Sequence, residues 1–573
     1  MRSFRTLFDA LDGVTGTRAK VEALAAHLAT TPAADAAWAV ALLLGRRRRR
    51  LITGRRLREV LRERSGLPAW LIDDCHAHVG DSAETIALLW PQVSVPPGPE
   101  PGGRVAALPD WLVSPEPDAL ARRPLHWWME VALPQLAALE GEEQADALVA
   151  LWTALPRGDH FLINKLLSGG FRVGVSSGLV ARAIARAFSL EETLVLQRLM
   201  GGFDPSAGRF AALVAPAGAG EEATGGRPYP FFLASPLDPA ALTDTPPQHW
   251  WLEWKWDGIR GQLVRRSGAI CLWSRGEELI NEAFPELEAM AEALPAGTVL
   301  DGEVMVWAAG EERPRGFASL QRRLGRKRVD AALQRELPAC FVAYDLLEQG
   351  GEDRRQQPLQ QRREALNAVV EAISRNERDR CLRRLRLSPG WPLEAWDQLD
   401  TLREAARDLG AEGLMLKRID SPYLAGRRRG HWWKHKLEPM TLDAVLLYAQ
   451  AGSGRRANLF TDYTFALWDR PGHESGDRRL VTFAKAYSGL DQAEIEQLDR
   501  WIRRHTIDRF GPARSVSPEL VFELGFEGIH PSSRHKCGLA VRFPRILRWR
   551  HEKPAEEADC LQAAQALMGT SHP

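Results

Sequence analysis

The sequence predicts a multidomain protein with an all-α N-terminal region, an α+β middle domain and a strand-rich C-terminal domain. Helical periodicity extends to about residue 215, and the segment Ala-Gly-Ala-Gly-Glu-Glu-Ala-Thr-Gly-Gly at 217–226 has the composition of a flexible linker. Short β-type runs recur after Pro439. A chain of 573 residues is long enough for three or four domains. We expect their boundaries at 1–215, 228–438 and 441–573.

Composition excludes several classes of protein. Lys and Arg number 75 against 74 Asp and Glu, so any nucleic-acid binding must come from local basic patches. The six cysteines form no Cys-x-x-Cys pattern, which argues against a disulfide framework or a zinc ribbon. The most apolar run, residues 36–44, is too short for a membrane span, and no signal-peptide pattern follows Met1. We therefore expect a soluble, cytoplasmic protein with no membrane partner.

The N-terminal half contains helices and two local basic features. Residues 36–44 predict a buried helix, and residues 80–85 predict a turn followed by a helix cap from Asp81 or Ser82. Five consecutive arginines at 46–50 are as consistent with a solvated face as with phosphate contacts.

A second feature of this half is the stretch Leu-Leu-Ser-Gly-Gly-Phe-Arg-Val-Gly-Val at 166–175. Gly169 and Gly174 on either side of Arg172 would let backbone amides approach a phosphate, although a tight helix–helix connection is an equal alternative. In the helix that follows, Arg182 and Arg186 share the face opposite an apolar stripe.

The middle domain is organised around Lys255 in the pattern Lys-x-Asp-Gly-x-Arg. Alone, this pattern would fit an ordinary hairpin. Its significance comes from the motifs that follow in order, with helices predicted at 282–294 and 359–375. These motifs are Leu300-Asp301-Gly302-Glu303, Tyr344-Asp345, Glu412-Gly413-Leu414-Met415-Leu416-Lys417, Lys434-His435-Lys436 and Arg542-Phe543-Pro544-Arg545.

These residue types suit nucleophilic attack on a nucleotide phosphate. An attacking amine must be unprotonated, whereas a free lysine has a pKa near 10.4, and cations or desolvation favour the neutral form. Lys434 and Lys436 are spaced so that both point to one side of a strand. Carboxylates such as Glu303 and Glu412 beside a phosphate pocket are suited to Mg²⁺ or to a sugar.

The C-terminal domain has β-type runs at 442–448, 463–467 and 480–487 and one helical segment at 491–504. This arrangement suits an OB-fold β-barrel, but strand content alone does not separate that fold from another small barrel.

The ordered motifs resemble those of the covalent nucleotidyltransferases, and most closely the ATP-dependent DNA ligases. The resemblance implies that Lys255 carries AMP, that Glu253 meets adenine and that Tyr344 stacks on it. It assigns Arg260, Arg275 and Arg428 to ribose and phosphate, and Glu303 and Glu412 to Mg²⁺ or, for Glu303, the ribose. Lys434 and Lys436 would neutralise the phosphates. Arg550 and Lys553, with Arg542 and Arg545, would orient the pyrophosphate leaving group of ATP.

Residues 1–210 resemble the helical DNA-binding domain of the larger members of that family. A Leu-x-Gly-x-x-Arg-x-Gly stretch grips the DNA backbone there, which implies such contacts for Gly169, Arg172 and Gly174, and the basic face adds Arg182 and Arg186. The chain departs from the family at Glu552, where Asp is usual before the final lysine; we expect altered reach but preserved function.

The resulting prediction is a monomeric enzyme that uses ATP and Mg²⁺ to seal nicked duplex DNA through lysyl-AMP and 5′-adenylated DNA. RNA ligases and GTP-using capping enzymes share the core, but the long helical N-terminus and the Arg-Phe-Pro-Arg motif argue against both. NAD-dependent ligases carry a four-cysteine zinc module that this sequence lacks. A non-catalytic DNA-binding protein is disfavoured because the motif set is complete.

Overall fold

The computed structural model describes 15 segments of the chain, separated by short gaps. They are residues 1–14, 16–45, 50–93, 108–113, 119–169, 174–216, 225–242, 245–266, 268–324, 326, 329–374, 384–452, 459–472, 477–511 and 513–570. The chain divides into two compact units. The first comprises Met1–Thr15, Arg47–Gly174 and Glu438–His572, and the second comprises Gly16–Arg46, Val175–Leu437 and Pro573. The three domain boundaries expected from sequence stay predictions.

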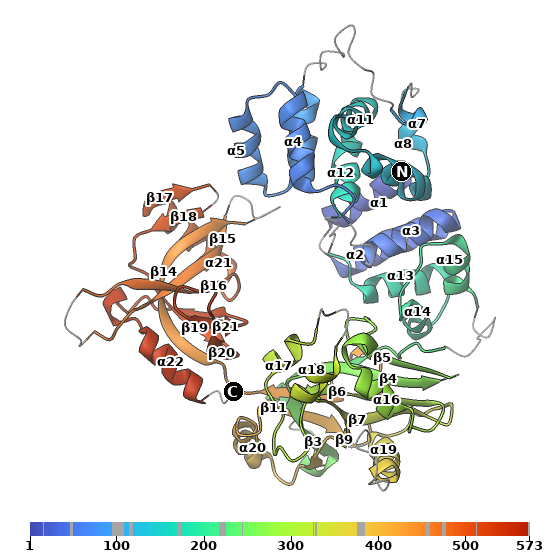
Figure 1. The fold of residues 1–573 in the computed structure, drawn as a ribbon, viewed down its shortest axis with the longest axis vertical. Coiled ribbons are helices and arrows are strands. Elements are labelled where there is room, and N and C mark those ends of the chain that lie inside the picture. Colours follow the sequence, from blue (N-terminus) through green and yellow to red (C-terminus); the bar gives the residue numbers. More distant parts are fainter. Residues whose placement is uncertain are drawn as a thin grey trace. The chain divides into compact units, whose positions relative to one another are not determined.

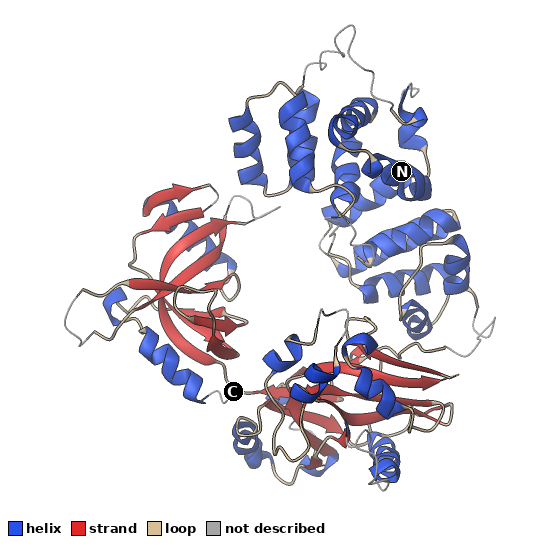
Figure 2. Ribbon diagram, viewed as in Figure 1, coloured by secondary structure: helices blue, strands red, loops and turns tan. Residues whose placement is uncertain are grey.

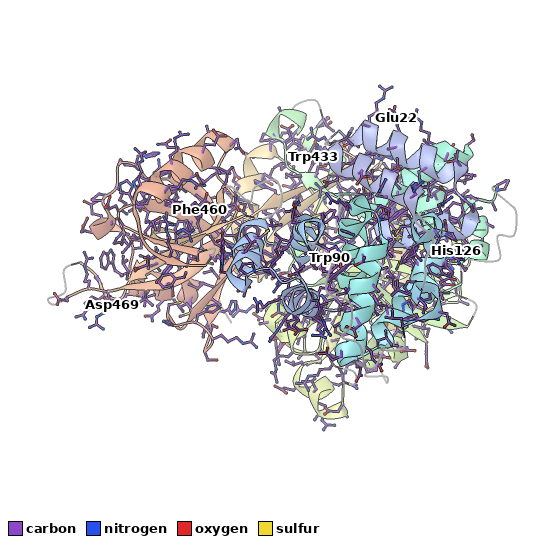
Figure 3. The ribbon with its side chains drawn as sticks, turned by 90° about the horizontal axis from the view of Figure 1, so that it is seen from above. Glu22, Trp90, His126, Trp433, Phe460 and Asp469 are labelled. Atoms are coloured by element: carbon purple, nitrogen blue, oxygen red, sulfur yellow. The ribbon has the colours of Figure 1, made fainter. Side chains whose placement is uncertain are left out.

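The first unit holds most of the N-terminal helices (Figure 2). They are α1 (Arg2–Gly13), α4 (Gly54–Arg64), α5 (Ala69–Val79), α6 (Ser82–Leu89), α7 (Asp110–Val113), α8 (Ala119–Arg122), α9 (Leu125–Trp127), α10 (Leu133–Ala138), α11 (Gly141–Ala154) and α12 (His160–Ser168). The predicted cap at the start of α6 is confirmed, because the Asp81 carboxylate accepts from the Glu84 N–H at 3.0 Å. Buried tryptophans fill this core: the rings of Trp90, labelled in Figure 3, and Trp152 lie 5.1 Å apart.

Five further helices belong to the second unit (Figure 1). They are α2 (Thr17–Thr30), α3 (Ala33–Leu43), α13 (Ser177–Phe188), α14 (Glu192–Leu199) and α15 (Ala207–Val214). Helix α13 packs on α2 and α14, and α15 packs on α3. The predicted stripe is confirmed, since Val180, Ala183 and Ile184 are buried while Arg182 and Arg186 are exposed.

Two sheets form the α+β part of the second unit. The first sheet has the order β10 (Gly390–Pro392), β3 (Trp250–Trp256), β11 (Ala411–Arg418), β13 (Trp432–Lys436), β2 (Ser235–Pro236). The second sheet has the order β5 (Ala269–Ser274), β4 (Ile259–Arg266), β6 (Thr298–Val306), β7 (Ala339–Gln349), β8 (Glu352–Asp353), with β9 (Leu385–Leu387) also on β7. A separate short pair joins β1 (Phe232–Leu233) to β12 (Gly426–Arg427).

Helices α16 (Pro285–Ala291) and α19 (Leu359–Ser374) pack on the second sheet. The remaining helices of this part are α17 (Phe317–Gln321), α18 (Ala331–Glu336) and α20 (Leu399–Ala405). The main core combines Phe284, Leu300, Phe341 and Leu366, all fully buried. The helix predicted at 359–375 is therefore found as α19. The one predicted at 282–294 is shorter, because a 3₁₀ turn at Asn281–Ala283 precedes Pro285, which suits a first helical position.

The C-terminal region of the first unit is strand-rich, as predicted. Its strands are β14 (Met440–Ala451), β15 (Phe460–Trp468), β16 (Leu480–Ala486), β17 (Thr506–Phe510), β18 (Ala513–Val516), β19 (Val521–Phe526), β20 (Gly528–Pro531), β21 (Leu539–Arg542) and β22 (Arg545–Trp549), and its helices are α21 (Gln492–Arg504) and α22 (Leu561–Thr570). The expected closed barrel is not observed among the described strands. One edge of the long strand β14 is shared by β18 and β19, so the sheet forks and ends at β16, β17 and β22.

None of the helices within the described segments is both long and apolar enough to cross a membrane.

Candidate active site

Lys255 lies on β3 opposite a β-bulge in β11. Ala411 pairs with Trp256 and Leu414 pairs with Trp254, so Glu412 and Gly413 together face the single residue Lys255. Gly413 has φ +131°, and a Cβ there would lie 2.2 Å from the His435 carbonyl oxygen, so only glycine fits. The extra residue turns the Glu412 side chain to the face that carries Lys255. The Lys255 ammonium donates to the Glu412 carboxylate.

Two more lysines surround this pair from the neighbouring strand. Lys434 and Lys436 of β13 pair with Met415 and Gly413 of β11, and both point to the same side as predicted. The Lys436 Nζ lies 3.7 Å from the Glu412 carboxylate. Burial alone would raise the pKa of Glu412, but Lys255 and Lys436 hold it below its usual value.

Lys434 lies in an environment that disfavours its own charge. Burial lowers the pKa of Lys434, and the nearby cations Arg427, Lys436, Lys255 and Arg275 lower it further. Clustered cations repel one another unless an anion with several charges joins them. The cluster of Lys255, Lys434 and Lys436 is therefore suited to hold the phosphates of a nucleotide.

Glu253 is two residues before Lys255 on β3, which places both side chains on one face. Its buried carboxylate accepts from the Lys417 Nζ at 2.6 Å and from the Arg363 Nη1 at 3.1 Å. Sequence reasoning missed both partners. Met415 faces Glu253 across the ladder, and Lys417, two residues later, has the same strand parity as Met415. This register is the signal that could have identified Lys417 as a partner of Glu253.

Lys417 connects the carboxylate to an aromatic wall. Its Nζ lies 4.4 Å from the centroids of both the Tyr344 and the Trp432 rings. Burial lowers the pKa of Lys417, while Glu253 opposes that effect. Tyr344 is itself the unpaired residue of a bulge, since Asp345 pairs with Asp301 and Ala343 pairs with Gly302. The bulge gives the Tyr344 ring the partial exposure that stacking on a flat base requires.

On the second sheet a fully buried Asp301 organises three neighbours. It accepts from the Arg260 Nη2 at 2.7 Å, from the Tyr423 hydroxyl at 2.6 Å and from the Tyr344 hydroxyl at 3.3 Å. Arg260 pairs with Glu303 across the β4–β6 ladder. Asp301 therefore fixes the positions of Arg260 and Tyr344, a role that its place in the sequence did not reveal.

Glu303 is the carboxyl group most disfavoured as an anion in this site. Burial raises the pKa of Glu303 to about 8; Lys255 and Arg260 oppose the rise, and Asp301 and Glu412 add to it. Across the segments that the structure describes, no three His, Cys, Asp or Glu side chains form a complete metal site. The oxygens of Glu303 and Glu412 nevertheless fit the ligand preference of Mg²⁺, which commonly takes one or two carboxylates and completes its shell with phosphates and water.

Two of the predicted phosphate contacts, Arg275 and Arg428, lie at the margins of these sheets. Arg275 is exposed just after β5, and its backbone N–H donates to the Arg260 carbonyl at 2.9 Å. The positive charge of Arg275 contributes to lowering the pKa of Lys434. Arg428 is exposed after β12. Their roles stay predictions.

In the C-terminal region, Arg550 and Lys553 converge on Asp443. The Arg550 Nη1 lies 3.1 and 3.0 Å from the two Asp443 oxygens, and the Lys553 Nζ lies 2.8 Å from one of them. Glu552, the departure from the family pattern, accepts from the Arg550 Nε at 2.7 Å. A buried carboxylate thus holds both cations, and no pattern in the sequence indicated Asp443 as their partner.

The candidate DNA contacts are only partly within the described residues. Gly169 ends α12 with φ +70°, and Gly174 has φ +61°, but Arg172 and the arginines at 46–49 lie outside the described segments. On α13 the Arg182 Nε lies 3.3 Å from Glu192, and the Arg186 Nη1 lies 3.4 Å from Glu22, which is labelled in Figure 3.

Family models of DNA ligases match most of the chain. Residues 231–436 match the family described as ATP dependent DNA ligase domain, residues 1–185 match DNA ligase N terminus, and residues 456–553 match ATP dependent DNA ligase C terminal region. A probable DNA ligase of Koribacter versatilis (strain Ellin345) is 33% identical over 480 residues, 79% of each chain. A DNA ligase of Natronomonas pharaonis is 30% identical over 459 residues, 77% of each chain. The solved structure Pmar-Lig_PreS3 is 14% identical, with a TM-score of 0.56 over 96% of this chain and 99% of that one, and supports the fold alone.

Proposed function

This chain belongs to the family of ATP-dependent DNA ligases, and we propose that it seals nicks in duplex DNA through a lysyl-AMP at Lys255. The observation that carries this proposal is the Lys255 amine held by Glu412 opposite a bulge, with Lys434 and Lys436 beside it. Few other chemistries need a lysine nucleophile among further lysines and carboxylates.

The reaction has three balanced steps. The neutral Lys255 amine attacks the α-phosphorus of ATP, so that an N–P bond forms, the bond to pyrophosphate breaks and the nitrogen loses one proton. An oxygen of the DNA 5′-phosphate then attacks the same phosphorus, and Lys255 leaves as an amine that takes up a proton. Finally the 3′-hydroxyl attacks the 5′-phosphorus, loses its proton and releases AMP.

The surrounding residues would bind and orient the reactants. Tyr344 would stack on adenine, and the neighbouring Glu253–Lys417 pair would contact the base. Arg260, Arg275 and Arg428 would contact ribose and phosphate. Lys434 and Lys436 would neutralise the phosphates, which lowers the cost of adding negative charge at phosphorus.

Mg²⁺ would be held by Glu303 and Glu412 together with phosphate oxygens. Its chemistry would be to neutralise charge on the reacting phosphate. Glu412 would thus serve both the Lys255 ammonium that it now holds and the metal site.

The pyrophosphate would be oriented by Arg550 and Lys553. Arg550 and Lys553 each use only some of their N–H groups to donate to the Asp443 carboxylate. Their remaining donors can meet the β- and γ-phosphates while Asp443 keeps the two side chains in place.

DNA would be bound by Gly169, Arg172, Gly174, Arg182 and Arg186 through its phosphates and without sequence preference. We expect the enzyme to act as a cytoplasmic monomer on nicked duplex, since one chain supplies every proposed role.

The test is the sealing of a nicked duplex with Mg²⁺ and one nucleotide at a time. We expect sealing with ATP and none with GTP or NAD, and a Lys255→Arg variant should seal nothing although its charge is kept. Sealing driven by GTP or NAD would overturn the proposal. A nick in RNA serves as the second substrate, and faster sealing of RNA than of DNA would favour an RNA ligase.

A further inference from the structure

The C-terminal sheet ends at β17, a strand with an open edge. Among the strands that the structure describes, β17 pairs with β18 alone, and the two form a hairpin (Figure 1). On such an edge strand every second residue directs its N–H and C=O away from the sheet. These main-chain groups can pair with one more extended strand, so an open edge is a template for binding another chain.

One face of this edge carries exposed apolar side chains. Tyr448 of β14 and Asp508 of β17 both pair with Ser515 of β18, so their side chains point to one side of the sheet. Phe510, two residues after Asp508, points to the same side. Tyr448 is 37% exposed and Phe510 is 59% exposed. Ile507, the extra residue of a bulge just before Asp508, is 60% exposed. Three large apolar side chains thus gather around one strand, and such a patch marks an interaction site.

The opposite face of the same edge is basic. Arg509 lies between Asp508 and Phe510 and so points to the other side, where it pairs with Arg514 of β18. Burial lowers the pKa of Arg514, and the charges of Arg509 and of Arg503 on α21 lower it further. Like charges directly opposite each other destabilise a pair of strands. An anion that contacted both arginines would remove this repulsion, so this face is suited to carboxylates.

We propose that the edge of β17 binds an extended segment of a partner protein in which apolar and acidic residues alternate. Successive side chains of a strand point to opposite faces, so the added segment would place its apolar residues beside Phe510 and its acidic residues beside Arg509. Main-chain hydrogen bonds would supply affinity, and the alternation would supply specificity. DNA fits this edge less well, because Asp508 on the apolar face would repel phosphates and a nucleic acid cannot continue the sheet. This role is separate from the nucleotide chemistry at Lys255.

The probe is the fluorescein-labelled peptide Val-Glu-Val-Glu-Phe-Glu-Val-Glu-Val, compared with the same peptide in which lysine replaces each glutamate. Fluorescence anisotropy with the full chain should show that the glutamate peptide binds at least about tenfold more tightly than the lysine peptide. Arg509→Glu should reverse this preference, and Phe510→Ser should weaken binding of the glutamate peptide about tenfold. Because both residues are exposed, neither variant should lower the thermal unfolding midpoint.

Tyr487→Ala is the matched control, because Tyr487 is 72% exposed and follows β16, the strand at the other end of the sheet order. It should bind both peptides as the unaltered protein does. The proposal is overturned if the two peptides bind alike or not at all, if Tyr487→Ala weakens binding as much as Phe510→Ser, or if Phe510→Ser lowers the unfolding midpoint, which would make the ring a packing element. Displacement of the glutamate peptide by nicked duplex DNA, together with loss of DNA affinity in Arg509→Glu, would assign the edge to DNA instead.

Discussion

Lys255 of the nucleotide site and the two arginines of helix α13 are paired with carboxylates, but in different surroundings. Lys255 and Glu412 have side chains 21% and 19% exposed, whereas Arg182 and Arg186 are 49% and 56% exposed. An exposed pair contributes about 0–1 kcal/mol, so Arg182 and Arg186 can exchange Glu192 and Glu22 for DNA phosphates at little cost. A half-buried pair is screened less and restrains its atoms more. We infer that the nucleotide site positions the reacting groups, whereas the arginines of α13 contribute affinity for DNA.

The largest effect should follow from breaking the half-buried pair. Glu412→Ala removes the carboxylate that holds Lys255 and is the proposed Mg²⁺ ligand, so lysyl-AMP formation should slow at least about a hundredfold, or roughly 2.7 kcal/mol of barrier. Binding of nicked DNA should stay within twofold. Single-turnover labelling and anisotropy measure the two quantities. If Glu412→Ala lost both lysyl-AMP formation and binding of nicked DNA, the nucleotide site and the face of α13 would not be independent.

The second prediction concerns the pH dependence of stability in the nucleotide site. Because burial raises the pKa of Glu303 to about 8, the folded protein binds more protons than the unfolded chain between about pH 4.5 and 8. Stability without Mg²⁺ should therefore fall as pH rises through that window. Glu303→Gln should abolish this part of the fall and be more stable than the unaltered protein at pH 8, by on the order of 4 kcal/mol.

Thermal unfolding in EDTA at pH 5 and pH 8 measures this difference, and the two proteins should be nearly alike at pH 5. Added Mg²⁺ should stabilise the unaltered protein at pH 8 more than Glu303→Gln. Parallel pH profiles for the two proteins would show that Glu303 does not carry the effect.

A smaller effect is expected from the exposed face of α13. Arg182→Ala and Arg186→Ala should each weaken binding of nicked DNA a few-fold and make the slope of log affinity against log salt shallower by about one unit. Adenylation should not change, and unfolding should shift by less than about 0.5 kcal/mol, because the pairs with Glu192 and Glu22 are exposed. An unchanged salt slope would show that these arginines contact no phosphate.

The smallest effect should come from Glu552→Asp, which restores the usual family residue. Glu552 is exposed and accepts from Arg550, whose position Asp443 also fixes. Adenylation should change less than about tenfold, or ~1.4 kcal/mol. A larger drop would show that the longer side chain is required at this position.

Features that depend on neighbours along the chain could be predicted from the sequence, whereas contacts between distant residues could not. Local patterns predicted the helix at 359–375, the stripe of α13 and the common direction of Lys434 and Lys436, because each depends on neighbours along the chain. The partners of Glu253 were not predicted, because Lys417 and Arg363 lie 164 and 110 residues away in sequence.

The two bulges and the open sheet were missed for a related reason. The bulge in β11 changes the strand parity between Glu412 and Met415. No local sequence pattern predicts which pair of strands will contain a bulge. Closure of the C-terminal sheet likewise depends on pairings between distant strands. The fork at β14, where β18 and β19 share one edge, cannot be deduced from strand content.

The amine opposite the β11 bulge should become covalently attached to AMP. The full chain, incubated with ATP and Mg²⁺ and digested under conditions that keep phosphoramidates intact, can be mapped by peptide mass spectrometry. We predict one AMP adduct, on Lys255, and none in Lys255→Ala. An adduct on Lys434, Lys436 or Lys417, or continued labelling of Lys255→Ala, would show that Lys255 is not the nucleophile.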